Sequence, residues 1–111
     1  MPQDIECDTH WARIFIAGPL DIIEQVCREY VFHVGLCVTV TPTKYIYTGG
    51  EETGVEIGLI NYPRFPSTHD EIKERAISLA HKIMNETHQG SYTVMTSKTT
   101  YYYSRRDEYK R

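Results

Sequence analysis

The order in which the hydrophobic residues change their spacing constrains the fold of this chain more than any other feature. Alternation with period two, typical of strands, gives way to spacings of three and four, typical of amphipathic helices, and back again. The segments are, in chain order, strand 11–17, helix 21–34, strand 36–48, strand 55–61, helix 68–88 and strand 92–96. This order predicts an α+β fold of the ferredoxin-like βαββαβ type, an antiparallel sheet with both helices on one face.

Residues with capping chemistry stand where both helices are expected to begin. The carboxylate of Asp21 can accept the first free amides of the first helix, so we expect Asp21 to be its N-cap. Ser67 or Thr68 can cap the second helix in the same way. Asp70 or Glu71, three residues later, would then complete a capping box.

The two central strands are expected to form a hairpin. Residues 49–54, Gly-Gly-Glu-Glu-Thr-Gly, have the composition of a turn and predict where the chain reverses. Pro42 cannot donate to a strand ladder, so it should lie on an edge strand or at a bulge. Residues 99–104 follow a Ser-Lys turn and are compatible with a fifth strand at the sheet edge.

The length of 111 residues is that of one domain. We therefore expect a single domain over 1–111, with flexible ends at 1–10 and 106–111. No apolar run is long enough to span a membrane, and the start of the chain does not resemble a signal peptide, which predicts a cytoplasmic protein without a membrane partner. One sheet face is left without a helix, and Val31 and Phe32 broaden the apolar surface of the first helix. These two features predict a homo-oligomer, a dimer or larger.

The charge of the chain argues against a general nucleic-acid binder. Its formal net charge is −3 and its pI is near 5.9, whereas such binders usually carry an excess of Lys and Arg. A local alternative remains at the C-terminal end. Tyr101 and Tyr103 share one face of a strand and precede Arg105 and Arg106, so they could stack the bases of a single strand on the open sheet face.

The familiar patterns of metal and catalytic sites do not occur in the sequence. The histidines and the three cysteines lack the spacing of a zinc site, so we expect neither a metal nor a cofactor. We also expect no catalytic residue. The enzymatic alternative is a small enzyme acting on a nucleotide or anionic ligand. It would use Glu51 and Glu52 as paired carboxylates, or His33 or Arg64.

The expected hairpin and the segment that follows it hold most of the side chains suited to binding. Arg64 stands between two prolines, so its preset backbone would lose little entropy on binding an anion. Tyrosine and arginine are also common binding anchors. An internal ion pair of Arg64 with Glu51 or Glu52 is an equally good reading. The expected ligand-binding or partner-binding residues are Tyr45, Tyr47, Glu51, Glu52, Asn61, Tyr62, Arg64 and Phe65, with Tyr101, Tyr103, Arg105 and Arg106 as a secondary surface.

The amino-acid sequence of three segments resembles that of small uncharacterised proteins of tailed bacteriophages. The segments are Gly35–Glu52, Gly58–Pro66 and Ser104–Arg106, within a resemblance that covers residues 11–106. Phage proteins of this size are often accessory factors, and several such families bind a host protein or sequester a nucleotide signal as oligomers. The resemblance implies that class and the host-cell cytoplasm, but it transfers no functional residue.

Together these observations favour a non-enzymatic binding module. We expect a phage accessory factor that antagonises a host process by binding a host protein or a small, anionic, nucleotide-like ligand. The small enzyme and the single-stranded nucleic-acid binder are the two alternatives.

Overall fold

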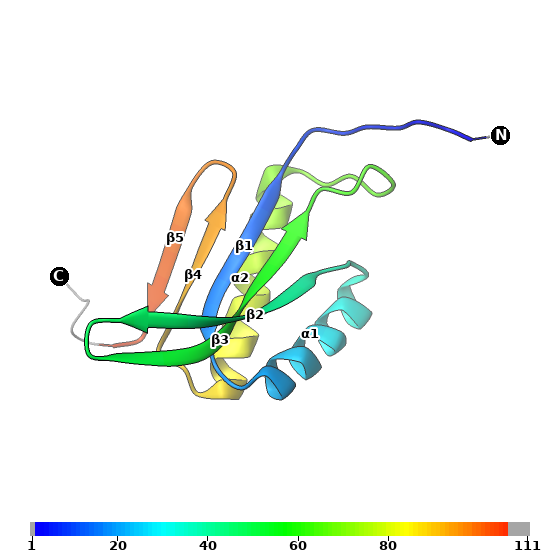
Figure 1. Ribbon diagram of the computed structural model, residues 1–111. Helices are drawn as coiled ribbons and strands as arrows, with labels where there is room; N and C mark the ends of the chain where they lie inside the picture. The colour runs from blue at the N-terminus through cyan, green and yellow to red at the C-terminus, as the bar shows by residue number, and fades with distance from the viewer. Residues whose placement is uncertain (1, 107–111) are drawn as a thin grey trace.

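Five antiparallel strands form one sheet in the order β2-β3-β1-β4-β5. The computed structural model describes residues 2–106 (Figure 1). Its elements are β1 Trp11–Ala17, α1 Leu20–Val34, β2 Thr39–Tyr47, β3 Gly50–Ile60, α2 His69–Thr87, β4 Ser91–Thr96 and β5 Thr100–Ser104. The predicted α+β plan is confirmed, with β5 as the extra edge strand. Apart from Arg106, the expected flexible end at 106–111 lies outside the described residues.

Both helices lie on the same side of the sheet (Figure 1). Alternate residues of the central strands, such as Ile14 and Ile57, are fully buried beneath α2. The stripe of α2 that meets them includes Leu79 and Ile83, which are also fully buried. The opposite alternation, including Phe15, faces away from the helices, so this sheet face is open as predicted.

The two helices begin in different ways. Thr68 is the N-cap of α2, and its side chain and that of Glu71 form the predicted capping box. The prediction for α1 is wrong, because Pro19 is the N-cap and Asp21 lies inside the first turn, where it accepts a bond from the amide of Ile22 at 2.9 Å. The ring of Pro19 fixes φ at −73° in an extended backbone, and its carbonyl accepts the first helical bond.

The hairpin turn is shorter than predicted. Tyr47 pairs with Gly50, so only Thr48 and Gly49 connect the strands, and Gly49 adopts a φ of 91° that favours glycine. Residues 50–54 therefore belong to β3 and not to the turn. The hairpin also continues beyond the rest of the sheet, since Gly54 already pairs with Ala17, the last residue of β1. β2 is an edge strand, as Pro42 predicted.

The segment before β1 has no regular secondary structure over residues 2–10. It is nevertheless attached to the end of β3 through Asn61. The side-chain amide of Asn61 donates to the carbonyl of Asp8 at 2.7 Å, and its backbone amide donates to that of His10 at 2.8 Å. Neither helix in residues 2–106 is long and apolar enough to cross a membrane.

Candidate functional site

The residues predicted to bind a ligand separate into two groups at opposite ends of β3. Tyr45, Tyr47 and Glu52 lie near the hairpin tip, whereas Tyr62 and Phe65 follow the end of the strand. A strand rises by about 3.3 Å per residue, so ten residues separate the groups by about 30 Å. Each group lines its own hollow. The single binding surface expected from the sequence is therefore divided between the two ends of β3.

The hollow near the hairpin tip, the tip groove, has a volume of about 250 Å³. It opens on the sheet face without helices and is bounded by the projecting hairpin, the ends of β1 and β4, and the segment after β5. Its lining residues are Phe15, Ile16, Ala17, Tyr45, Tyr47, Glu52, Gln89, Ser91, Tyr92, Thr93 and Arg106.

Two tyrosines hold the hairpin side of the tip groove. The hydroxyl of Tyr45 donates to the carbonyl of Val55 at 2.5 Å, and its ring lies against Gly54, where any side chain would collide with it. Burial raises the pKa of Tyr45. The hydroxyl of Tyr47 donates to Oε1 of Glu52 at 3.0 Å. This bond to a carboxylate raises the pKa of Tyr47, because it favours the protonated phenol.

The two adjacent glutamates do not work as a pair. Neighbouring residues of a strand point to opposite faces, and here Glu52 lines the tip groove while Glu51 forms an ion pair with Lys44 at 3.0 Å. The alternative of paired carboxylates at Glu51 and Glu52 is therefore wrong. Glu52 alone brings a carboxylate to the groove.

Two arginines after β5 have different surroundings. Arg106 lines the tip groove, and its positive charge acts on Tyr47 against the rise in that pKa. Arg105 instead donates to the side chain of Asn85 on α2 at 2.7 Å. The groove thus combines a carboxylate, a guanidinium and aromatic rings. A carboxylate beside aromatic rings favours a cation, and a guanidinium favours an anionic group.

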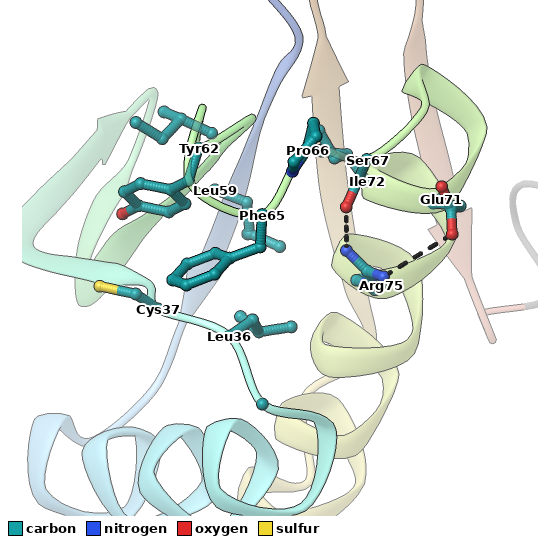
Figure 2. A pocket seen from close by; sticks show the side chains of 12 residues that line it. Leu36, Cys37, Leu59, Tyr62, Phe65, Pro66, Ser67, Glu71, Ile72 and Arg75 are labelled. Carbon is teal, nitrogen blue, oxygen red and sulfur yellow. Dashed lines mark hydrogen bonds and ion pairs between the residues drawn. The ribbon is translucent and has the colours of Figure 1, made fainter. Parts of the chain in front are cut away.

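The second hollow, the exit pocket, has a volume of about 200 Å³ and lies where the loop after β3 meets both helices (Figure 2). Its lining residues are Gly35, Leu36, Cys37, Leu59, Ile60, Tyr62, Phe65, Pro66, Ser67, Glu71, Ile72 and Arg75. The rings of Tyr62 and Phe65 lie 6.3 Å apart, and a hydrogen bond with the thiol of Cys37 raises the pKa of Tyr62.

Two residues predicted near the exit have other roles. Asn61 is buried and structural, because its Oδ1 accepts the amide of Ser67 at 2.7 Å while its amide group binds the N-terminal segment. Arg64 lies 6.0 Å from the ring of Phe65 and does not line the pocket. The alternative reading, an ion pair of Arg64 with Glu51 or Glu52, is wrong, because those carboxylates lie at the far end of β3.

The two tyrosines of the secondary surface are not on the open face. Tyr101 and Tyr103 pack against the core on the helix side, where Tyr103 stacks on Tyr92 at 5.6 Å and lies 4.7 Å from His81. Their rings are therefore not placed to stack bases on the open face, which removes the geometry on which the nucleic-acid alternative rested. His33 lines neither the tip groove nor the exit pocket. Its ring contacts Phe32 at 5.5 Å.

Sequence reasoning missed several residues that line the two hollows. In the tip groove, strand alternation alone could have assigned Phe15 and Thr93 to the open face. In the exit pocket, the spacing of four between Glu71 and Arg75 indicates a helical pair, but no sequence signal places Leu36 beside it. Among residues 2–106, no group of acidic, histidine and cysteine side chains could hold a metal ion.

The fold as a whole is that of two solved phage enzymes. No family model and no curated protein matches the chain. A phage SAM lyase in its apo state superposes with a TM-score of 0.69 at 18% identity, covering 86% of this chain and 88% of that chain. A phage SAM lyase in complex with S-methyl-5'-thioadenosine gives a TM-score of 0.61 at 14% identity, covering 94% of this chain and 95% of that chain.

These structures change the functional expectation. The predicted resemblance to phage proteins is supported, but both neighbours are lyases, not accessory binding factors. The expectation of a non-enzymatic binding module is contradicted by this finding. The alternative of a small enzyme acting on a nucleotide-like ligand agrees better with it.

Proposed function

We propose that this chain is a lyase that cleaves S-adenosylmethionine and releases S-methyl-5'-thioadenosine. The observation that carries the proposal is the shared fold, which extends over 86% and 94% of the chain in the two phage SAM lyase comparisons. The tip groove supports it, because it offers the chemistry that such a substrate requires.

The substrate and the product together define the bond that breaks. S-methyl-5'-thioadenosine keeps the methyl group and the adenosyl group, so the bond between sulfur and the four-carbon amino acid chain is lost. Sulfur takes the bonding electron pair and leaves as a neutral thioether, which needs no proton. The carbon released can be attacked by the substrate's own carboxylate, which closes a lactone and balances the reaction without water.

The tip groove can bind both ends of this substrate. The carboxylate of Glu52, fixed by Tyr47, faces the open groove and can attract the sulfonium. The rings of Phe15, Tyr45 and Tyr47 offer faces on which adenine can stack. Arg106 can hold the substrate's carboxylate. The exit pocket, by contrast, is smaller than the tip groove, at about 200 Å³ against about 250 Å³.

The change of charge during the reaction indicates which role Glu52 can have. The sulfonium charge disappears as the bond breaks, so a carboxylate beside it stabilises the substrate at least as well as the transition state. We therefore assign Glu52 to binding and not to acid-base chemistry.

A direct assay tests the proposal. Incubation of the protein with S-adenosylmethionine should produce S-methyl-5'-thioadenosine, measured by liquid chromatography and mass spectrometry. Glu52→Gln should raise KM by about tenfold or more, with a smaller effect on kcat, because it removes a charge contact made before the reaction. Glu51→Gln is the matched control and should leave both constants unchanged, since Glu51 points away toward Lys44. Absence of product would refute the function, and a loss of kcat alone in Glu52→Gln would refute the assigned role.

The tip groove is incomplete as a single-chain site. Its volume of about 250 Å³ is below the range of about 300–1,000 Å³ typical of ligand pockets. At the hairpin tip, the side chains of Ile46 and Tyr47 are 77% and 52% exposed. We propose that a second copy covers this face and completes the site, so that the protein acts as a homo-oligomer. Light scattering should then give a mass at least twice 12.9 kDa, whereas a monomer at assay concentration with full activity would contradict it.

A further inference from the structure

The exit pocket lies about 30 Å from the tip groove along β3 and has no part in the proposed reaction. It is built by three segments that are distant in sequence: the end of α1 with residues 35–37, the loop after β3, and the first turns of α2. Figure 2 shows apolar side chains, among them Leu36 and Phe65, on one side and the pair of Arg75 and Glu71 on the other. A hollow with an apolar part and one charge of each sign suits a small amphiphilic ligand.

Arg75 is held in place but keeps hydrogen-bonding capacity. Its Nη1 donates to the hydroxyl of Ser67 at 2.8 Å, which fixes the plane of the guanidinium. Its Nη2 lies 3.8 Å from the carboxylate of Glu71, which is an ion pair but longer than a hydrogen bond. A guanidinium has five N–H donors, so this one can still bind a carboxylate. The side chain of Arg75 is 34% exposed, which leaves it accessible to a ligand.

Negative charge lies on the same pocket wall and at its floor. One carboxylate oxygen of Glu71 accepts the amide of Thr68 at 2.8 Å, and this bond lowers the pKa of Glu71 and keeps it ionised. At the floor, α1 ends at Gly35, whose φ of 77° terminates the helix. The last carbonyls of a helix carry partial negative charge and favour a cation. The polar part of the pocket is thus suited to a zwitterion.

The apolar part limits the size of the ligand. Leu36, Leu59, Phe65 and Ile72 line it, and the whole volume of about 200 Å³ admits one medium-sized side chain. We propose that the exit pocket binds a free α-amino acid with an apolar side chain, its carboxylate on Arg75 and its ammonium toward Glu71 and the end of α1. This site is independent of the proposed lyase activity, and its test needs no turnover.

NMR titration of the ¹⁵N-labelled protein with L-leucine and L-methionine tests the site. Either amino acid should shift the amide signals of residues 35–37 and 65–75 and leave those of the tip groove unchanged. The comparison compounds are 3-methylbutylamine, which lacks the carboxylate, and 4-methylpentanoate, which lacks the ammonium. Both should bind at least about tenfold more weakly than leucine, because each loses one charged contact. Binding of either compound as tight as that of leucine would overturn the proposal. So would an absence of shifts at an amino acid concentration about ten times a Kd of 1 mM.

Variants locate the site. Arg75→Gln should weaken leucine binding by about tenfold or more. Arg64→Gln, which changes an arginine on the loop after β3 that does not line the pocket, should leave it unchanged. Equal effects of the two variants would overturn the assignment. If Arg75→Gln fails to fold, the exposed thiol of Cys37 at the pocket provides a second test. In a Cys7→Ser background, leucine should slow alkylation of Cys37, and an unchanged alkylation rate counts against the proposal.

Discussion

Single residues decide how closely β1, β2 and β3 approach one another. At Gly54, the position of a Cβ is already occupied by the backbone of Ile16 and Ala17 and by the ring of Tyr45. The absence of a side chain at Gly54 therefore lets Tyr45 lie across the sheet and form the wall of the tip groove. A glycine inside a strand can indicate such a close approach, but the sequence pattern placed Gly54 in the predicted turn.

Replacing Gly54 should disturb the fold more than replacing Gly58. Gly54→Ala places a methyl group against rigid backbone, so we expect it to lower the free energy of unfolding by about 2 kcal/mol. In Gly58→Ala the new methyl group meets the hydroxyl of Thr39, a side-chain atom that can rotate away, so the loss should stay below about 1 kcal/mol. Urea denaturation of both variants measures the difference. Equal losses of unfolding free energy would contradict the expected difference between the backbone contact at Gly54 and the side-chain contact at Gly58.

At the scale of elements, the start of each helix shows how far a local signal can be read. The capping box at Thr68 and Glu71 is a contact within four residues, so sequence alone predicted it. Asp21 carries the same chemistry, but Pro19 already supplies the extended backbone and the first accepting carbonyl of α1. The prediction for α1 failed because Asp21 has a side chain that can cap a helix, whereas Pro19 has the backbone conformation and position of the N-cap.

This difference between the helices predicts unequal effects of two similar substitutions. Thr68→Ala removes the bond to the amide of Glu71 and should lower the free energy of unfolding by about 1 kcal/mol. Asp21→Ala removes only a favourable charge in the first turn and an exposed bond to Ile22, so it should cost a few tenths, at most about 0.5 kcal/mol. Urea denaturation of the two variants, at the same pH and salt concentration, provides the comparison. A loss in Asp21→Ala as large as that in Thr68→Ala would make Asp21 a functional cap.

At the scale of the whole molecule, the buried core makes stability depend on alkaline pH. Cys27 is buried between α1 and the sheet, and burial raises its pKa from 9.0 to about 11. Burial also raises the pKa of Tyr92 above its ordinary value. Above pH 9 the unfolded chain loses the thiol proton while the folded chain keeps it, so the free energy of unfolding falls as pH rises.

The window and size of this effect follow from Cys27. Its contribution is complete below pH 9 and lost progressively up to about pH 11, and it amounts to about 3 kcal/mol. In Cys27→Ala the free energy of unfolding should fall less steeply across this window, measured by urea denaturation at a series of pH values. Cys37→Ala, which removes an exposed thiol, should keep the slope of the native chain. Identical slopes for the native chain and Cys27→Ala would contradict the assignment.

The sequence by itself determined the identity and order of the elements, because periodicity and capping act over a few neighbouring residues. Of the residues that the sequence predicted to bind a ligand, five line a hollow in the structure: Tyr45, Tyr47, Glu52, Tyr62 and Phe65. Tertiary structure decided the rest. The two-residue turn at Thr48 and Gly49 fixes the register of the hairpin. A register shift of one residue would turn every side chain of the strand to the other face. The turn therefore decides that Glu52 points into the tip groove and Glu51 away from it. The exit pocket likewise exists only because folding brings residues 35–37 against the start of α2, a proximity that no local pattern encodes.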